Sequence, residues 1–183
     1  MKLKIIDNYL TQSYHKEIQD LLTGSDFPWF YNRNINDNEN TNSKALNVYG
    51  FTHIFYKDSS FRDSRYATFI KPMLLNLKDT VNCDYVLRSR ADMVTWSYKE
   101  FIHDAHVDFY FPNVATVFYI NDTDGDTIIY KQSHPLEIKE RVNPKANRLV
   151  IFEGDVLHTG SSPTKHKNRI LINSNFNNES NTN

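Results

Sequence analysis

Beyond residue 84 the sequence consists of short apolar segments separated by turn residues, a pattern that strongly limits the possible folds. Apolar runs of this length, bounded by Pro, Asn, Asp and Gly, are typical of consecutive β-strands. The expected strands are Tyr85–Trp96, Ala105–Asp108, Val114–Ile120, Thr127–Tyr130, Arg148–Phe152 and Arg169–Asn175. Several short strands at this spacing predict a β-sandwich or jelly roll.

The first 84 residues have a different pattern, because apolar side chains recur there at helical spacing in two stretches. One predicted helix covers residues 11–23, and Gly24 follows it as a stop signal. The other covers residues 66–80, where Pro72 is expected to disturb the first turns. The fold class expected is therefore mainly β with flanking helices.

A single domain over the whole chain of 183 residues is expected, since this length can bury one core. Residues 1–84 would form a helical and strand support, residues 85–176 the core, and residues 177–183 a frayed tail. Within the support, the aromatic cluster at residues 27–31 is expected to begin a strand. The Asn-rich residues 32–47 are expected to form an exposed loop.

Charge and cysteine content exclude several classes of protein. The net charge is −1, so there is no basic surface of the kind that binds nucleic acid nonspecifically. Cys83 is the single cysteine, which rules out an internal disulfide and a multi-cysteine zinc site. No apolar run approaches the roughly 18 residues of a membrane span, and the first residues do not resemble a secretory signal. A cytoplasmic location is expected.

Two histidines and one aspartate form the candidate metal site. On an extended strand residues i and i+2 face the same way, so His106 and Asp108 can both reach one ion. His158 follows a strand and a turn, at a place where it can lie on an opposing strand. Two imidazoles and a carboxylate on one face of a metal form the facial triad of non-haem Fe(II) oxygenases, which leaves the other positions open.

Other histidines in the chain lack such partners. The triplet His15-Lys-Glu17 lies on a predicted helix, where i and i+2 diverge, so we interpret it as surface. His103, His134 and His166 are also interpreted as surface residues. Asp104 should point away from the metal because side chains alternate along a strand.

A cation and a polar strand face accompany the candidate triad. Alternation places Arg169, Leu171, Asn173 and Asn175 on one face, and the polar members suit the lining of a cavity. Arg169 can bind the far carboxylate of a diacid cosubstrate bidentately, which a planar guanidinium does well. Lys167 is the second choice for this anchor.

Further residues are candidates for contacts in the same cavity. The hydroxyl of Tyr119, on a neighbouring predicted strand, can donate to the same distal carboxylate. Arg90, Met93, Thr95 and Tyr98 precede the metal motif and are candidates for lining a substrate pocket, although ordinary strand and loop positions explain them equally well.

The stretch from about Arg88 to Phe176 resembles the 2-oxoglutarate- and Fe(II)-dependent dioxygenases, in particular the prolyl 4-hydroxylase-like branch. The matching pieces are His106-Val-Asp108, Phe118-Tyr-Ile-Asn121, Asp124-Gly-Asp-Thr127, Pro144–Phe152, Leu157-His158 and Asn168–Ile172. The N-terminal part is similar to small stand-alone members from bacteria and phages. Two glycines of the family pattern are replaced here, by Asp124 and by Asn147, and asparagine tolerates left-handed backbone geometry.

The resemblance implies a double-stranded β-helix core, which is a cupin-like jelly roll. It implies that His106, Asp108 and His158 bind Fe(II) and that Arg169 and Tyr119 hold 2-oxoglutarate. We add Asn173 to the expected cosubstrate site because it shares the face of Arg169. The implied reaction is hydroxylation of an unactivated C–H bond with O2, releasing succinate and CO2, with ascorbate as an optional reductant.

The substrate and two other classes of protein stay open at this point. A prolyl residue of a peptide and a free amino acid or similar small molecule are the candidate substrates. A zinc-dependent hydrolase also uses three N/O ligands and a water. A non-catalytic jelly-roll module that binds a metal or ligand is the remaining alternative. The hydrolase gives no role to Arg169 or Tyr119.

Overall fold

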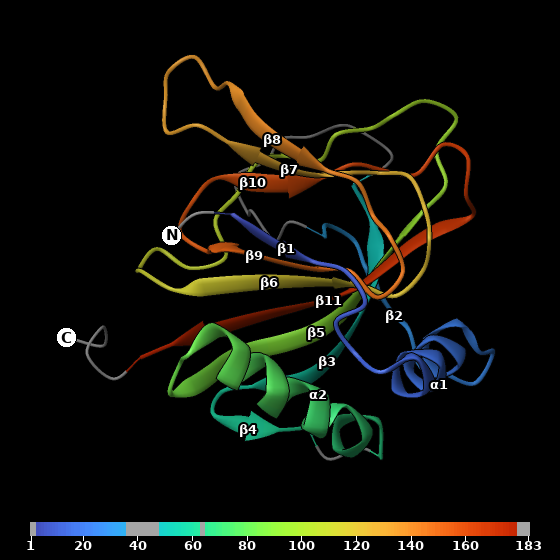
Figure 1. Cartoon of the computed structure of the whole chain (residues 1–183). Helices are drawn as coiled ribbons and strands as arrows, with labels where there is room; N and C mark the ends of the chain where they lie inside the picture. Colours follow the sequence, from blue (N-terminus) through green and yellow to red (C-terminus); the bar gives the residue numbers. More distant parts are fainter. Residues whose placement is uncertain (1–2, 36–47, 63–64, 179–183) are drawn as a thin grey trace.

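The computed structural model describes residues 3–35, 48–62 and 65–178, which form two helices and two antiparallel sheets (Figure 1). The helices are α1 (Gln12–Thr23) and α2 (Arg65–Val81). The strands are β1 (Lys4–Ile6), β2 (Phe30–Asn32), β3 (Gly50–Lys57), β4 (Ser60–Phe61), β5 (Tyr85–Thr95), β6 (Val114–Tyr119), β7 (Thr127–Tyr130), β8 (Ile138–Val142), β9 (Leu149–Glu153), β10 (His158–Gly160) and β11 (Asn168–Asn177).

The larger sheet has the order β1-β9-β6-β11-β5-β3-β2, with β4 paired to β3. The smaller sheet has the order β10-β7-β8 and lies over the opposite face from the helices (Figure 1). The expected fold class, mainly β with flanking helices, is confirmed. Neither helix in the described part of the chain is long and apolar enough to cross a membrane.

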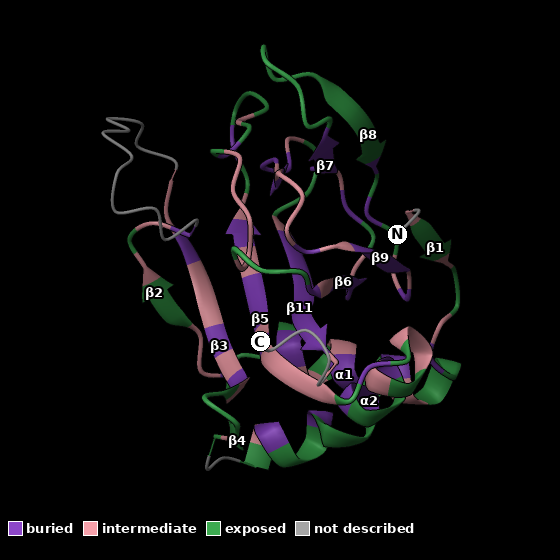
Figure 2. Ribbon diagram, turned by 90° about the vertical axis from the view of Figure 1, so that its left-hand side faces the viewer, coloured by how far each residue is buried: buried purple, intermediate pink, exposed green. Residues whose placement is uncertain are grey.

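Alternating side chains of the larger sheet serve two separate cores. One set packs against α1 and α2, and its members include Phe118, Ile120, Ile172 and Phe176. The other set faces the smaller sheet, and its members include Val117, Tyr119, Val150 and Leu171. The strands β6, β9 and β11 are therefore buried on both faces, which explains their nearly continuous apolar sequences (Figure 2).

The N-terminal segment contributes strands to both ends of the larger sheet as well as helices. β1 pairs with β9, and β2 and β3 extend the sheet beyond β5. The side chain of Asn147 holds the N-terminal segment, because it accepts from the backbone N–H of Leu10 at 2.8 Å and donates to its carbonyl at 2.9 Å. Asn147 has a φ of 62°, the left-handed geometry expected for the residue that replaces a glycine.

Several boundaries differ from the sequence-based expectations. Pro72 lies inside α2 without ending it, since the helix runs from Arg65 to Val81. Of the expected loop at residues 32–47, residues 36–47 lie outside the described residues. Within the tail expected from residue 177 onward, Asn177 still belongs to β11, and residues 179–183 lie outside the description.

The predicted strand at residues 105–108 is wrong. Only His106 pairs there, in an isolated bridge with His158. Four strands that the sequence pattern did not reveal are β1, β3, β4 and β8. Short or mostly exposed strands such as β8 carry too few inward-facing apolar residues to produce an alternating pattern (Figure 2).

Candidate active site

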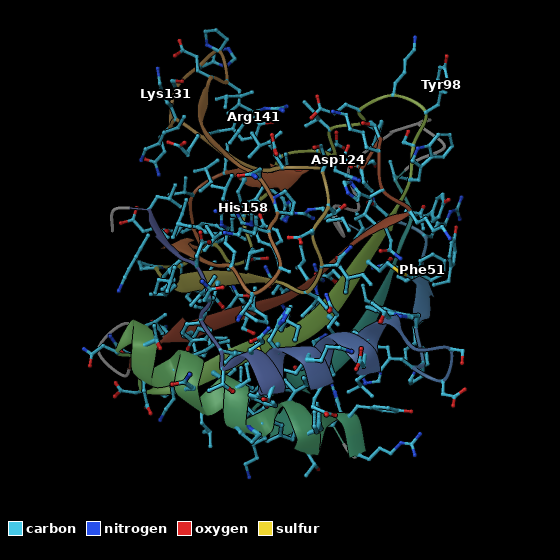
Figure 3. The ribbon with its side chains drawn as sticks, turned by 45° about the vertical axis from the view of Figure 1, so that its right-hand side comes forward. Phe51, Tyr98, Asp124, Lys131, Arg141 and His158 are labelled. Carbon is cyan, nitrogen blue, oxygen red and sulfur yellow. The ribbon has the colours of Figure 1, made fainter. Side chains whose placement is uncertain are left out.

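His106, Asp108 and His158 converge between the two sheets. Each offers one ligand atom, and these atoms lie within 4.8 Å of one another. The two imidazole rings have their centroids 4.7 Å apart, and Nε2 of His158 lies 3.6 Å from Oδ2 of Asp108. Figure 3 shows His158 in the interior between the sheets. The structure therefore brings together all three predicted ligands.

Backbone pairing, not a regular strand, holds the three ligands in place. The N–H of His106 donates to the carbonyl of His158, and the N–H of His158 donates to the carbonyl of His106, both at 2.9 Å. The N–H of Asp108 donates to the carbonyl of Gly154 at 3.2 Å. The i, i+2 convergence of His106 and Asp108 thus arises in a loop tied to β10 and to the turn after β9.

The hydrogen bonds of both histidines leave the same ring nitrogen free. Nδ1 of His158 lies 2.8 Å from the carbonyl of Val156, and Nδ1 of His106 lies 3.3 Å from the carbonyl of Asp104. A carbonyl oxygen only accepts, so each Nδ1 carries the proton and each Nε2 keeps its lone pair. Burial lowers the pKa of His106 to about 4, which keeps this imidazole neutral at pH 7.

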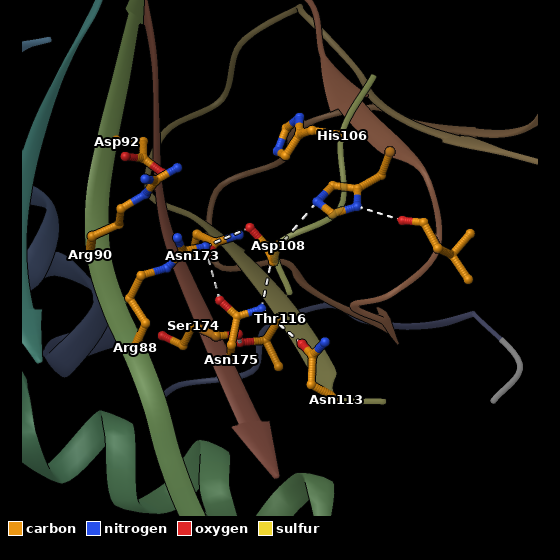
Figure 4. Close-up of polar contacts among 12 residues, drawn as sticks. Arg88, Arg90, Asp92, His106, Asp108, Asn113, Thr116, Asn173, Ser174 and Asn175 are labelled. Atoms are coloured by element: carbon orange, nitrogen blue, oxygen red, sulfur yellow. Dashed lines mark hydrogen bonds and ion pairs between the residues drawn. The ribbon is translucent and has the colours of Figure 1, made fainter. Parts of the chain in front are cut away.

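Asp108 is held by two side chains from the larger sheet (Figure 4). Nη2 of Arg88 donates to Oδ1 at 2.5 Å, and Nδ2 of Asn175 donates to Oδ2 at 2.9 Å. Arg88 also donates to Oδ1 of Asn175 at 3.1 Å, so the three side chains form a closed triangle. Burial acts to raise the pKa of Asp108, but contacts with His158 and Arg88 outweigh it and hold that pKa well below its ordinary value.

Arg169 lines the same cavity and is buried, at 5% exposed. Its Nη2 donates to Oγ1 of Thr127 at 2.8 Å, and its Cζ lies 5.6 Å from the ring centroid of Tyr119. Its Nε is buried without a hydrogen-bond partner among the residues described. Gly160 is adjacent, and a Cβ there would lie 3.0 Å from Nη1 of Arg169. Lys167, the second candidate, is exposed and precedes β11.

Of the other two predicted cosubstrate residues, Asn173 lines the cavity and Tyr119 does not. The Tyr119 hydroxyl is fully buried, 2.6 Å from Oγ1 of Thr127, and lies behind that residue, outside the cavity lining. Asn173 lines the cavity, and its Oδ1 accepts from Nη2 of Arg88 at 3.5 Å. Thr127, absent from the predicted site, is the residue that links Tyr119 to Arg169.

Of the four candidates for a substrate pocket, only Arg90 lines the cavity. Met93 and Thr95 do not line it. Tyr98 is 82% exposed and lies at the periphery of the molecule (Figure 3). Asp92 lines the cavity and was not predicted, although its i, i+2 relation to Arg90 on β5 was a usable signal.

Two histidines predicted at the surface are buried, so those interpretations were wrong. His103 is 4% exposed and lines the cavity, because the segment before the metal motif folds inward and pairs with β10. His15 is 9% exposed, and its Nε2 lies 3.1 Å from the carbonyl of Ile120 under α1. His134 and His166 are exposed as predicted. Asp104 is exposed and is not among the grouped metal-ligand candidates, as predicted.

The chemistry of the donor set fits a divalent metal with open coordination positions. The ligand atoms are two imidazole Nε2 atoms with free lone pairs and one carboxylate oxygen, a combination that suits iron. The outer hydrogen bonds of all three ligands are already made, which fixes ring tautomers and carboxylate orientation. Fold and site together define a jelly-roll protein with a candidate two-histidine, one-carboxylate metal centre.

Residues 93–177 match the family described as the 2OG-Fe(II) oxygenase superfamily. This segment contains all three candidate ligands and Arg169, and it is similar to the members of that superfamily. The expected resemblance is thereby confirmed, and the match supports an enzyme of the oxygenase class. A search of curated protein sequences finds no match.

Solved structures with the same fold include prolyl hydroxylases. One is a prolyl hydroxylase from Trichoplax adhaerens in complex with a hypoxia inducible factor peptide fragment, with TM-score 0.70, 17% identity and coverage of 97% of this chain and 84% of that one. A Pseudomonas putida prolyl-4-hydroxylase has TM-score 0.57 and 10% identity, covering 96% and 92%. HygX from Streptomyces hygroscopicus, with nickel and 2-oxoglutarate bound, has TM-score 0.60 and 10% identity, covering 97% and 83%. The expected double-stranded β-helix core is confirmed.

Proposed function

We propose that this chain is an Fe(II)- and 2-oxoglutarate-dependent dioxygenase that hydroxylates an unactivated C–H bond. His106, Asp108 and His158 hold the metal in this proposal. The observation that carries it is the convergence of three ligand atoms within 4.8 Å, with a buried guanidinium lining the same cavity. A zinc hydrolase or a non-catalytic binding module is not favoured, because neither explains Arg169 or the family match.

When bound, Fe(II) and 2-oxoglutarate supply the chemistry that activates O2 and releases succinate and CO2. Arg169 binds the distal carboxylate, with Thr127 fixing the guanidinium by the 2.8 Å bond to Nη2. The remaining N–H groups of Arg169 are the donors for that carboxylate, and its buried Nε has no partner in the described part of the protein. Tyr119 acts through Thr127, as a support beneath the guanidinium, and Asn173 contributes a polar wall.

Apolar side chains complete the cavity and exclude water from the reacting atoms. Val117 on β6 and Leu171 on β11 line it from the larger sheet. A dry cavity strengthens the charged contacts of Arg88 and Arg169 and protects the reaction from hydrolytic side steps. O2 is the oxidant in this proposal, and ascorbate is an optional reductant.

Two substrate classes remain within the proposal. The Trichoplax enzyme is described with a peptide fragment, and HygX has been solved with hygromycin B bound, so related folds accept a peptide or a small molecule. We propose that residues 1–183 act as one domain, because β1, β2 and β3 complete the sheet that carries the site. A cytoplasmic setting is part of the proposal.

Anaerobic titration of the protein with Fe(II) and then 2-oxoglutarate tests the proposal. The expected result is a visible metal-to-ligand charge-transfer band that saturates at one equivalent of each. His158→Ala should abolish the band, whereas His134→Ala, at an exposed histidine, should leave it unchanged. A wild-type protein that binds zinc but develops no band with Fe(II) and 2-oxoglutarate would refute the oxygenase assignment.

A further inference from the structure

A second carboxylate lines the cavity but has no task in the proposed metal or cosubstrate site. Asp92 lies on β5, on the inward face that also carries Arg88 and Arg90, and its register partner on β11 is Leu171. It is 6% exposed and borders the cavity together with His106 and His158. Figure 4 shows Asp92 beside Arg90, separated from Asp108. Asp108 is the carboxylate ligand of the proposed metal site and Arg169 binds the cosubstrate, so neither role is assigned to Asp92.

Only one of the two carboxylate oxygens of Asp92 has a hydrogen-bond partner among the described residues. Its Oδ2 accepts from Nε of Arg90 at 3.0 Å, which fixes the carboxyl group in one orientation. Its Oδ1 is buried and has no hydrogen-bond partner anywhere in residues 3–35, 48–62 and 65–178. A buried acceptor without a donor is costly, so its presence in a ligand cavity points to a donor that arrives with the ligand.

The electrostatic setting favours a cationic donor. Burial raises the pKa of Asp92, although Arg90 and Arg88 act in the opposite direction. A positive charge that enters the cavity would offset this desolvation and stabilise the carboxylate. Apolar side chains such as Ile35, Val94 and Val117 make up much of the remaining wall, so few competing acceptors are available there.

We propose that Asp92 is a substrate-recognition residue that binds a protonated amine, with Arg90 as its positioning residue. This inference rests on the proposed function and deepens it by naming the substrate class. It favours a free amino acid or another small amine over a prolyl residue within a peptide. The nitrogen of a peptidyl proline carries no hydrogen, whereas the ammonium group of free proline carries two.

The wild-type protein alone can test this inference. The probes are the standard L-amino acids, each compared with the carboxylic acid that lacks its amine, such as L-proline with cyclopentanecarboxylate and L-leucine with 4-methylpentanoate. N-acetyl-L-prolinamide represents the peptide-bound form. The readouts are the shift of the anaerobic Fe(II)–2-oxoglutarate band when a probe binds and the probe-stimulated release of succinate. At least one amine should bind about 10- to 100-fold more tightly than its deaminated partner.

A variant assigns that preference to Asp92. Asp92→Asn should weaken binding of the preferred amine by about 10- to 100-fold and remove the preference over its deaminated partner. The affinity for 2-oxoglutarate should stay within about twofold, since Asp92 does not contact Arg169. Asp79→Asn, at an exposed carboxylate on α2, is the matched control and should behave as wild type.

The outcomes separate this inference from the proposed function. No band with Fe(II) and 2-oxoglutarate refutes the proposed function. A normal band with no amine that binds better than its deaminated partner, or with equally tight N-acetyl-L-prolinamide, overturns the inference alone. An Asp92→Asn variant that keeps the amine preference also overturns it. If Asp92→Asn fails to fold, the paired comparison in the wild-type protein remains decisive.

Discussion

Replacing Arg88 with glutamine tests whether a buried ion pair supports the carboxylate ligand. Arg88 and Asp108 have side chains that are 18% and 2% exposed, and Nη2 of Arg88 lies 2.5 Å from Oδ1 of Asp108. The substitution removes the cation and leaves Asp108 with Asn175 as its remaining partner from the larger sheet. Breaking a buried pair by removing one partner costs about 3–5 kcal/mol. We expect the metal-free Arg88→Gln protein to lose that much unfolding free energy.

The chain contains a matched control at the surface. Arg62 and Asp58 form a pair of the same type, with Nη2 3.1 Å from Oδ2, but their side chains are 44% and 70% exposed. A solvent-exposed pair contributes about 0–1 kcal/mol. Arg62→Gln should therefore lower the unfolding free energy by no more than that. Urea unfolding of both variants, followed by circular dichroism in the presence of a chelator, measures the difference directly.

Metal binding provides a second comparison for the same variant. A divalent cation at Asp108 supplies the positive charge that Arg88→Gln removes, so saturating Ni(II) should restore most of the lost stability. Ni(II) should consequently stabilise Arg88→Gln more than it stabilises the wild type. An Arg88→Gln protein that loses less than about 1 kcal/mol without metal, or that gains no more than the wild type from Ni(II), would refute the reasoning.

Two further predictions concern the cosubstrate end of the cavity. Arg169→Ala should weaken 2-oxoglutarate binding about 100-fold or more, since two charge-assisted hydrogen bonds of about 1.5–3 kcal/mol each are lost. Lys167→Ala, at the exposed second candidate, should leave the anaerobic titration unchanged. The reverse result would identify Lys167 as the residue that binds the distal carboxylate. Burial, with the nearby charge of Arg169, lowers the pKa of His103 from 6.5 to about 4. His103 takes up a proton below about pH 6.5 in the unfolded chain, but only below about pH 4 in the folded protein. The unfolding free energy is therefore not reduced by His103 above pH 6.5, and it falls as the pH drops from 6.5 toward 4. His103→Gln should remove about 2 kcal/mol of the loss in unfolding free energy between pH 7 and pH 5, and an unchanged pH profile would show that His103 is not desolvated.

The sequence predicted the strands that are buried on both faces, and the reason is physical. β6, β7, β9 and β11 have apolar or alternating residues over most of their length, so local pattern and tertiary burial agree. β8 has four exposed residues out of five and gives no such signal. β1 is three residues long and acquires its strand geometry from pairing with β9, which lies far away in the sequence.

The candidate metal ligands were predicted correctly as a set that converges, but for a partly wrong reason. The i, i+2 argument assumed a strand around His106, whereas a loop bridged to His158 performs the same alignment. Geometry of this kind depends on hydrogen bonds between segments about fifty residues apart, which local periodicity does not encode. The assignment of each ligand's role stays a prediction until metal is bound and measured.

The supporting residues were the hardest to predict. Arg88 contacts Asp108 and Asn175, which lie 20 and 87 residues away in the chain. His103 is buried because its backbone pairs with Gly160 and its carbonyl accepts from Thr159. No local pattern distinguishes such residues from surface polar residues, so their identification required the tertiary structure.

The pairing of β1 with β9 has a consequence for synthesis on the ribosome. Lys4 pairs with Ile151, so the first strand waits for roughly 145 further residues before its partner emerges. At about 5–20 residues per second, that delay is on the order of 10–30 s. Throughout this interval β1 has no strand to pair with, and that edge of the larger sheet forms only after β9 has been synthesised.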